Sequence, residues 1–85
     1  MENMVAVFNN RNKAMQFASM LKRLGVKSKI INTPRELSVS CGISVVLDSR
    51  NLGQVKNIIE KYGFRDVVKL YLVSGELFRK YHQIY

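Results

Sequence analysis

The sequence is poor in the residue types that build disulfides and metal sites. It contains one cysteine, Cys41, one histidine, His82, one proline and no tryptophan. A single cysteine cannot form a disulfide within the chain, whereas small exported domains are often rich in disulfides. One histidine and one cysteine also fall short of the four ligands of a usual zinc site. We therefore expect a reducing, cytoplasmic compartment, no metal and no cofactor.

Long apolar runs are also missing. The longest, residues 43–47 and 67–73, fall well short of the ~18 residues that a membrane span requires. The first residues lack the basic segment and the long apolar run of a secretory signal. These absences predict no membrane association and agree with a cytoplasmic location.

What the chain does have is positive charge and enough apolar residues for a core. Its 85 residues include 14 Lys and Arg against 6 Asp and Glu, a formal net charge of +8, and 47% of them are hydrophobic. This composition is typical of one small folded domain, and no linker divides residues 1–85. A domain of this size has little room for a multistep active site, so we do not expect an enzyme.

Hydrophobic periodicity predicts strands that alternate with helices. Short apolar or alternating runs, typical of strands, occupy residues 4–8, 26–31, 43–47 and 67–72. Apolar residues at helical spacing, with possible caps at their ends, occupy residues 11–24 and 52–62. Asn9 or Asn10 caps the first helix in this interpretation, and Asp48 or Ser49 precedes the second. Residues 76–85 are expected to form a short helix.

The resulting β-α-β-β-α-β order predicts an α+β fold of the ferredoxin-like type. In this sandwich two helices cover one face of a four-stranded antiparallel sheet, and the first and third strands are central. The two most apolar strands then lie in the centre. Lys27, Lys29 and Lys69 lie on the edge strands, where lysine discourages aggregation. The alternative is a small α/β fold with parallel strand pairing.

The segment between the second and third predicted strands carries the candidate chemistry. Thr33 and Glu36 have the spacing of a capping box, which predicts one helical turn over residues 34–37. The chain then enters the third strand just after Cys41 and Gly42. Because glycine has no side chain, a ligand or another backbone can approach the thiol closely there.

Three polar neighbours of Cys41 could support a reactive thiolate. The guanidinium of Arg35 would stabilise it by charge, and the hydroxyls of Ser38 and Ser40 can donate hydrogen bonds to it. These interactions favour a nucleophile or a sulfur carrier. The alternative is that Cys41 is a small buried hydrophobic residue, as free cysteines often are.

The run Pro-Arg-Glu-Leu-Ser-Val-Ser-Cys-Gly at residues 34–42 resembles the signature of a family of small bacterial selenium/sulfur carrier-like proteins. Phe8, Ala14 and Ile31 also match that family's pattern in spacing. The resemblance implies that Cys41 is the carrier thiol and holds a persulfide or selenosulfide. It implies a donor protein such as a cysteine desulfurase and, since the chain has no second cysteine, an external acceptor protein.

A second interpretation is a basic interaction module with a structural cysteine, which binds nucleic acid or an acidic protein. The third predicted strand has no aromatic residue for base stacking, so we do not expect specific nucleic-acid binding. If the end of the chain does not fold back, the edge of the fourth strand becomes a homodimer surface. Aromatic residues around that edge would contribute to it: Phe64, Tyr71, Phe78, Tyr81 and Tyr85.

Overall fold

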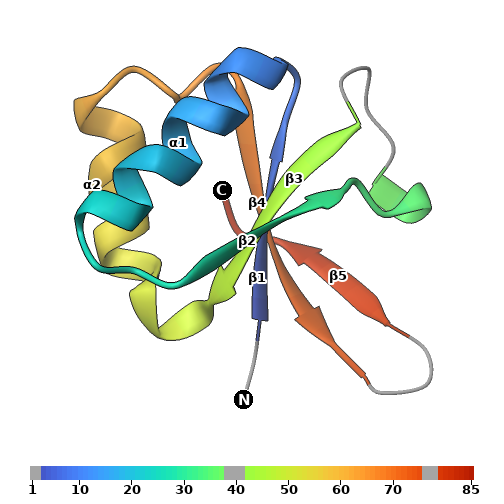
Figure 1. The fold of residues 1–85 in the computed structure, drawn as a ribbon. Helices are drawn as coiled ribbons and strands as arrows, with labels where there is room; N and C mark the ends of the chain where they lie inside the picture. Colours follow the sequence, from blue (N-terminus) through green and yellow to red (C-terminus); the bar gives the residue numbers. More distant parts are fainter. Residues whose placement is uncertain (1–2, 38–41, 76–78) are drawn as a thin grey trace.

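The computed structural model describes residues 3–37, 42–75 and 79–85. In chain order the elements are β1 (Asn3–Phe8), α1 (Arg11–Arg23), β2 (Ser28–Asn32), the 3-10 helix η1 (Arg35–Leu37), β3 (Ile43–Asp48), the 3-10 helix η2 (Ser49–Asn51), α2 (Leu52–Lys61), β4 (Val68–Ser74) and β5 (Lys80–Gln83). The strands form one sheet in the order β2-β3-β1-β4-β5. Both α-helices lie on the same side of this sheet (Figure 1).

The α+β class is confirmed, with one strand more than the ferredoxin-like prediction of four. Every strand pairing is antiparallel, so the parallel alternative is wrong. The two most apolar strands, β1 and β3, lie inside the sheet as expected, and β2 is an outer strand. The prediction that Lys69 lies on an edge strand is wrong, because β5 pairs with the far side of β4.

The predicted C-terminal helix is wrong, because Lys80–Gln83 forms β5. Tyr81 pairs with Val73 in register, and the backbone N–H of Ile84 donates to the carbonyl of Leu70 at 2.8 Å. The outer edge of β4 offers unpaired backbone groups, and pairing with them outweighs the weak helical pattern of this segment. Residues 76–78 of the predicted helix lie outside the described residues.

The N-terminal capping of α1 follows the sequence prediction. The side chain of Asn10 accepts a hydrogen bond from the backbone N–H of Lys13 at 3.1 Å, so Asn10 is the N-cap. Before α2, the Asp48 carboxylate accepts a hydrogen bond from the N–H of Arg50 at 2.9 Å and begins η2, which leads into the helix. The capping residues therefore set where both helical segments start.

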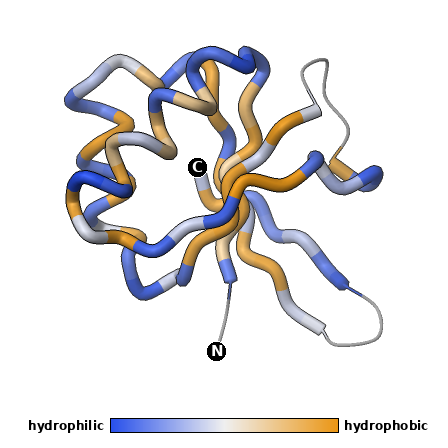
Figure 2. Tube along the Cα trace, in the orientation of Figure 1, coloured by the Kyte–Doolittle hydropathy of each residue, from blue (hydrophilic) through white to orange (hydrophobic). Residues whose placement is uncertain are grey.

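The core lies between the sheet and the two helices. Three buried phenylalanine rings join the layers: Phe8 from β1, Phe17 from α1 and Phe64 from the loop after α2. Their ring centroids are 5.1 to 6.1 Å apart, the range of favourable aromatic pairs. Figure 2 shows the hydrophobic stretches running along the central strands. In the described part of the chain no helix is both long and apolar enough to cross a membrane.

The face of the sheet that carries no helix is apolar as well. Side chains alternate between the two faces of a strand, so Val5 and Val7 point away from the core residues Met4, Ala6 and Phe8. Val5 and Val7 are nevertheless only 3% exposed. We call this side the helix-free face. Its apolar surface is continuous with the candidate site described next.

Candidate functional site

The structure describes two of the five predicted site residues. Arg35 lies in η1 and Gly42 directly precedes β3. Ser38, Ser40 and Cys41 lie outside the described residues. The structure therefore defines where the segment of residues 34–41 leaves β2 and where it rejoins the sheet.

Both ends of this segment are held together at the end of the β2–β3 pair. The backbone N–H of Thr33 donates to the carbonyl of Gly42 at 2.7 Å, which extends the β2–β3 ladder by one step. Gly42 has a φ of +70°, a left-handed conformation that glycine adopts without steric cost. The glycine next to Cys41 thus has a backbone role in turning the chain into β3.

A hydrogen bond between two hydroxyls adds a second link at the same point. Thr33 Oγ1 and Ser44 Oγ lie 2.8 Å apart, and Ser44 is fully buried. This geometry corrects the predicted capping box, because the Thr33 hydroxyl bonds across to β3 instead of capping the turn at Glu36. The helical turn itself is present as η1, with the N–H of Leu37 donating to the carbonyl of Pro34 at 2.9 Å.

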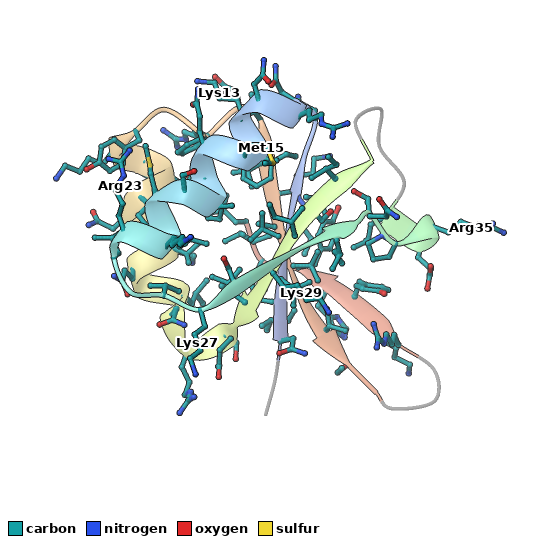
Figure 3. The ribbon with its side chains drawn as sticks, viewed as in Figure 1. Lys13, Met15, Arg23, Lys27, Lys29 and Arg35 are labelled. Carbon is teal, nitrogen blue, oxygen red and sulfur yellow. The ribbon has the colours of Figure 1, made fainter. Side chains whose placement is uncertain are left out.

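The Arg35 side chain points away from the sheet into solvent (Figure 3). The one ion pair within the described residues joins Asp48 to Arg50, so Arg35 has no carboxylate partner there. A guanidinium without such a partner keeps its charge available to an anion. The Asp48 pair lies at the opposite end of β3 from Gly42 and is not part of this site.

A cavity of about 310 Å³ with a mixed polar and apolar lining lies on the helix-free face beside the start of the segment. Pro34 forms part of its wall, while side chains of the central strands, such as Val5 and Val46, form its floor. Arg79 and Tyr81 line it from the far end of the chain. Sequence reasoning did not place Arg79 or Tyr81 beside the Cys41 segment, because the end of the chain was expected to be helical. Residues 80–83, Lys-Tyr-His-Gln, carry no clear alternation that would have signalled a strand.

The carboxylate of Asp48 interacts mainly with its near neighbour Arg50. The backbone N–H of Arg50 and then its side chain donate to the carboxylate, and these hydrogen bonds hold the pKa of Asp48 below its usual value. His82 is exposed on β5. Within the described ranges no three His, Cys, Asp or Glu side chains are grouped as a metal site would require.

Comparison with known families matches the chain to one family. The model described as "Putative Se/S carrier protein-like" matches residues 3–67, which is more than half of the chain and includes the Cys41 segment. The chain belongs to this selenium/sulfur carrier-like family. The match ends just before β4, so β4 and β5 lie beyond it. No curated protein and no solved structure matches the chain.

Proposed function

We propose that the protein is a carrier of sulfur or selenium and that Cys41 is the thiol that holds the cargo. The observation that carries this proposal is the family match over residues 3–67, which spans the Cys41 segment. The closed base of that segment supports it, because two hydrogen bonds at Thr33 fix where the cysteine-bearing chain emerges.

The chemistry of loading is a sulfur transfer without net oxidation. The Cys41 thiolate attacks the outer sulfur of a persulfide on a donor protein and forms a new S–S bond. The S–S bond of the donor breaks, and its cysteine leaves as a thiolate with the electron pair. The terminal sulfur keeps its proton, so Cys41 ends as a persulfide. Unloading repeats the step, with an acceptor thiolate attacking the outer sulfur and Cys41 leaving.

This chemistry requires two other proteins. With one cysteine in the chain, no second thiol can take the sulfur from Cys41 within the molecule. A cysteine desulfurase is a suitable class of donor, and the acceptor must be a separate protein. We propose a cytoplasmic, reducing location for the same reason, since the carrier thiol must be free between transfers. In this scheme the protein carries the atom and does not turn over a substrate alone.

The described residues around the segment suit such a role. Arg35 offers a positive charge without a carboxylate partner among the described residues, and a positive charge favours a thiolate. A Cβ built at Gly42 would meet no atom of the described residues within 4 Å, so those residues leave the space beside Gly42 open to a partner. We propose Ser38 and Ser40 as donors to the thiolate, because serine hydroxyls can donate hydrogen bonds to it.

Thiol reactivity tests the site. We expect Cys41 in the native protein to react with iodoacetamide at neutral pH, because a carrier thiol must be accessible and ionised. Arg35→Gln should move the midpoint of the pH–rate profile to higher pH. The matched control, Arg23→Gln on the exposed side of α1, should leave it unchanged. A native thiol that stays inert until the chain is unfolded would instead support the alternative, a basic interaction module with a structural cysteine.

A further inference from the structure

The outer edge of the sheet at β2 is open along its length. β2 pairs with β3 on one side, and no described strand pairs with it on the other. The backbone of Thr33 is hydrogen-bonded to that of Gly42, just before β3. Since inward and outward backbone groups alternate along a strand, the N–H and C=O groups of Lys29 and Ile31 also point toward β3. The same alternation directs the N–H and C=O groups of Ser28 and Ile30 outward, where another strand could bind them.

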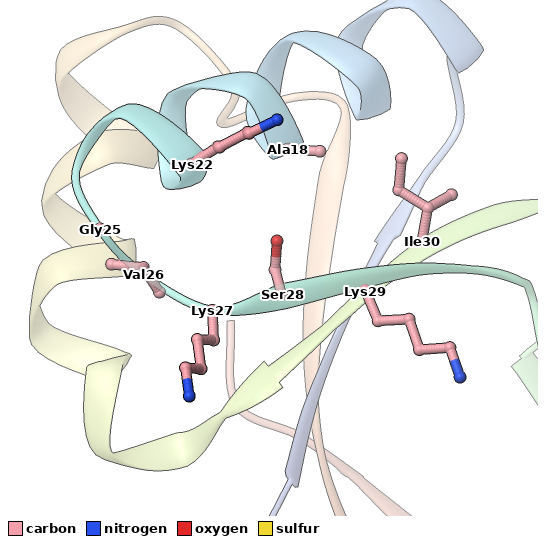
Figure 4. Close-up of a pocket in the computed structure, with 8 residues that line it drawn as sticks. All are labelled: Ala18, Lys22, Gly25, Val26, Lys27, Ser28, Lys29 and Ile30. Carbon is pink, nitrogen blue, oxygen red and sulfur yellow. The ribbon is translucent and has the colours of Figure 1, made fainter.

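This open edge forms one wall of a groove whose other wall is the C-terminal half of α1. The groove has a volume of about 680 Å³. Its lining residues are Ala18, Lys22, Gly25, Val26, Lys27, Ser28, Lys29 and Ile30. Ser28 and Ile30 point toward α1, whereas Lys27 and Lys29 point to the other side of the strand (Figure 4). No lining residue is acidic.

The side chains along this edge favour one class of partner. Lysines on an edge strand discourage pairing with a neutral strand or with a second copy of this chain, which would bring its own lysines. Protection of the edge against unwanted strand pairing does not explain Ile30, whose side chain is 43% exposed in the middle of the strand. Ile30 on one face of this edge, with Lys27 and Lys29 pointing to the other face, complements a strand that alternates apolar and acidic residues.

We propose that the edge of β2 binds an extended acidic segment of a partner protein, which adds to the sheet as a sixth, antiparallel strand. The added backbone pairs with the outward N–H and C=O groups of Ser28 and Ile30. An apolar side chain of the partner lies opposite Ile30, and acidic side chains lie opposite Lys29 and Lys27. The residues assigned to this surface, Lys27 to Ile30, include none of residues 34–41, so the proposal does not depend on the carrier chemistry.

A synthetic peptide with blocked ends and the core Val-Glu-Thr-Glu tests the proposal directly. In antiparallel register this core places Val opposite Ile30 and the two Glu residues opposite Lys29 and Lys27. We expect it to bind and to slow amide exchange at Ser28 and Ile30. A peptide with the core Val-Lys-Thr-Lys should bind at least about tenfold more weakly, because two attractions become repulsions.

Variants of the full chain separate strand pairing from general attraction to positive charge. Ser28→Pro removes an outward N–H without removing a bond to β3, and it should abolish binding while the fold remains intact by circular dichroism. Lys27→Glu with Lys29→Glu should weaken binding about tenfold or more. Lys61→Glu with Lys80→Glu, an equal change of net charge on exposed sites elsewhere, should change it less than about twofold.

Several outcomes would overturn the proposal. They are equal binding of both peptides, unchanged exchange at Ser28 and Ile30, or an equal effect of the two charge-reversed variants. Protection of the same amides in a dimer without peptide would assign the edge to a second copy. Protection by a single-stranded oligonucleotide that the acidic peptide cannot displace would assign it to nucleic acid. Retained binding by Cys41→Ala, which has no carrier thiol, keeps this test separate from that of the proposed function.

Discussion

The hydrogen bond between Thr33 and Ser44 gives an asymmetric prediction for two conservative variants. Thr33→Val removes the partner of a hydroxyl that is fully buried, and water cannot easily replace it. Ser44→Ala removes the buried hydroxyl and leaves that of Thr33, which is half-buried and can bind water. We expect Thr33→Val to lower the free energy of unfolding by about 2 kcal/mol and Ser44→Ala by about 1 kcal/mol.

The two changes should also be coupled. In the double variant neither hydroxyl remains, so we expect its cost to fall below the sum of the single costs by about 1 kcal/mol. Urea denaturation gives the free energies. Thermal melting provides a second measure, since about 1 kcal/mol corresponds to about 4–8 °C for a domain of this size. In Thr33→Val, the backbone N–H of residue 33, which donates to the carbonyl of Gly42, should also exchange with solvent faster.

Two results would refute this reasoning. If Ser44→Ala lowers the free energy of unfolding as much as Thr33→Val or more, the difference in burial between the two hydroxyls does not determine the cost of losing their hydrogen bond. If the single costs add within about 0.3–0.5 kcal/mol, the two hydroxyls do not interact in solution. Either result would remove the side-chain link that we assign to the base of the Cys41 segment.

Three further predictions concern the backbone, the core and pH. Gly42→Ala should lower the free energy of unfolding by about 1 kcal/mol, because φ is +70° at this residue. Gly53→Ala, within α2, should raise it by about 0.5–1 kcal/mol, because alanine favours a helix more than glycine does. Urea denaturation of both variants checks these two values. Phe17→Ala, within the three-ring cluster, should cost about 3–5 kcal/mol by the same assay, against less than about 0.5 kcal/mol for the exposed Met15→Ala. Asp48 has a lowered pKa when folded, so its stabilising effect is present above its unfolded pKa and is lost as pH falls through the folded value. Melting curves of the parent and Asp48→Asn should therefore differ at neutral pH and converge in acid, and a difference independent of pH would contradict the assignment.

Local patterns in the sequence were enough to predict most elements of this fold. The helical spacing around Phe17 and the capping side chain of Asn10 are local features, and they placed α1 to within one residue of its observed end. Apolar runs likewise placed β1 and β3. The predicted start of β2 was less accurate. Val26 is apolar because it packs in the core, but it precedes the strand, which begins at Ser28.

Features that depend on pairing between distant segments could not be predicted from the sequence. β5 forms because β4 offers it an edge, and no property of residues 80–83 alone specifies that edge. The contact of Thr33 with Ser44 depends on the register of β2 against β3. The cavity lined by Pro34 and Tyr81 depends on the positions of β5 and of the chain that follows β2. Residues 34–42 could nevertheless be singled out from the sequence as a candidate motif, and the family match covers them.

The most direct test of the account is the intact mass of the protein after incubation with a cysteine desulfurase and cysteine. The account predicts a gain of one sulfur atom that a reductant removes and that Cys41→Ala does not show. The same experiment with a selenium donor would reveal which cargo is preferred. No gain from either donor, with Cys41 still open to alkylation, would contradict the assignment of Cys41 as the carrier thiol.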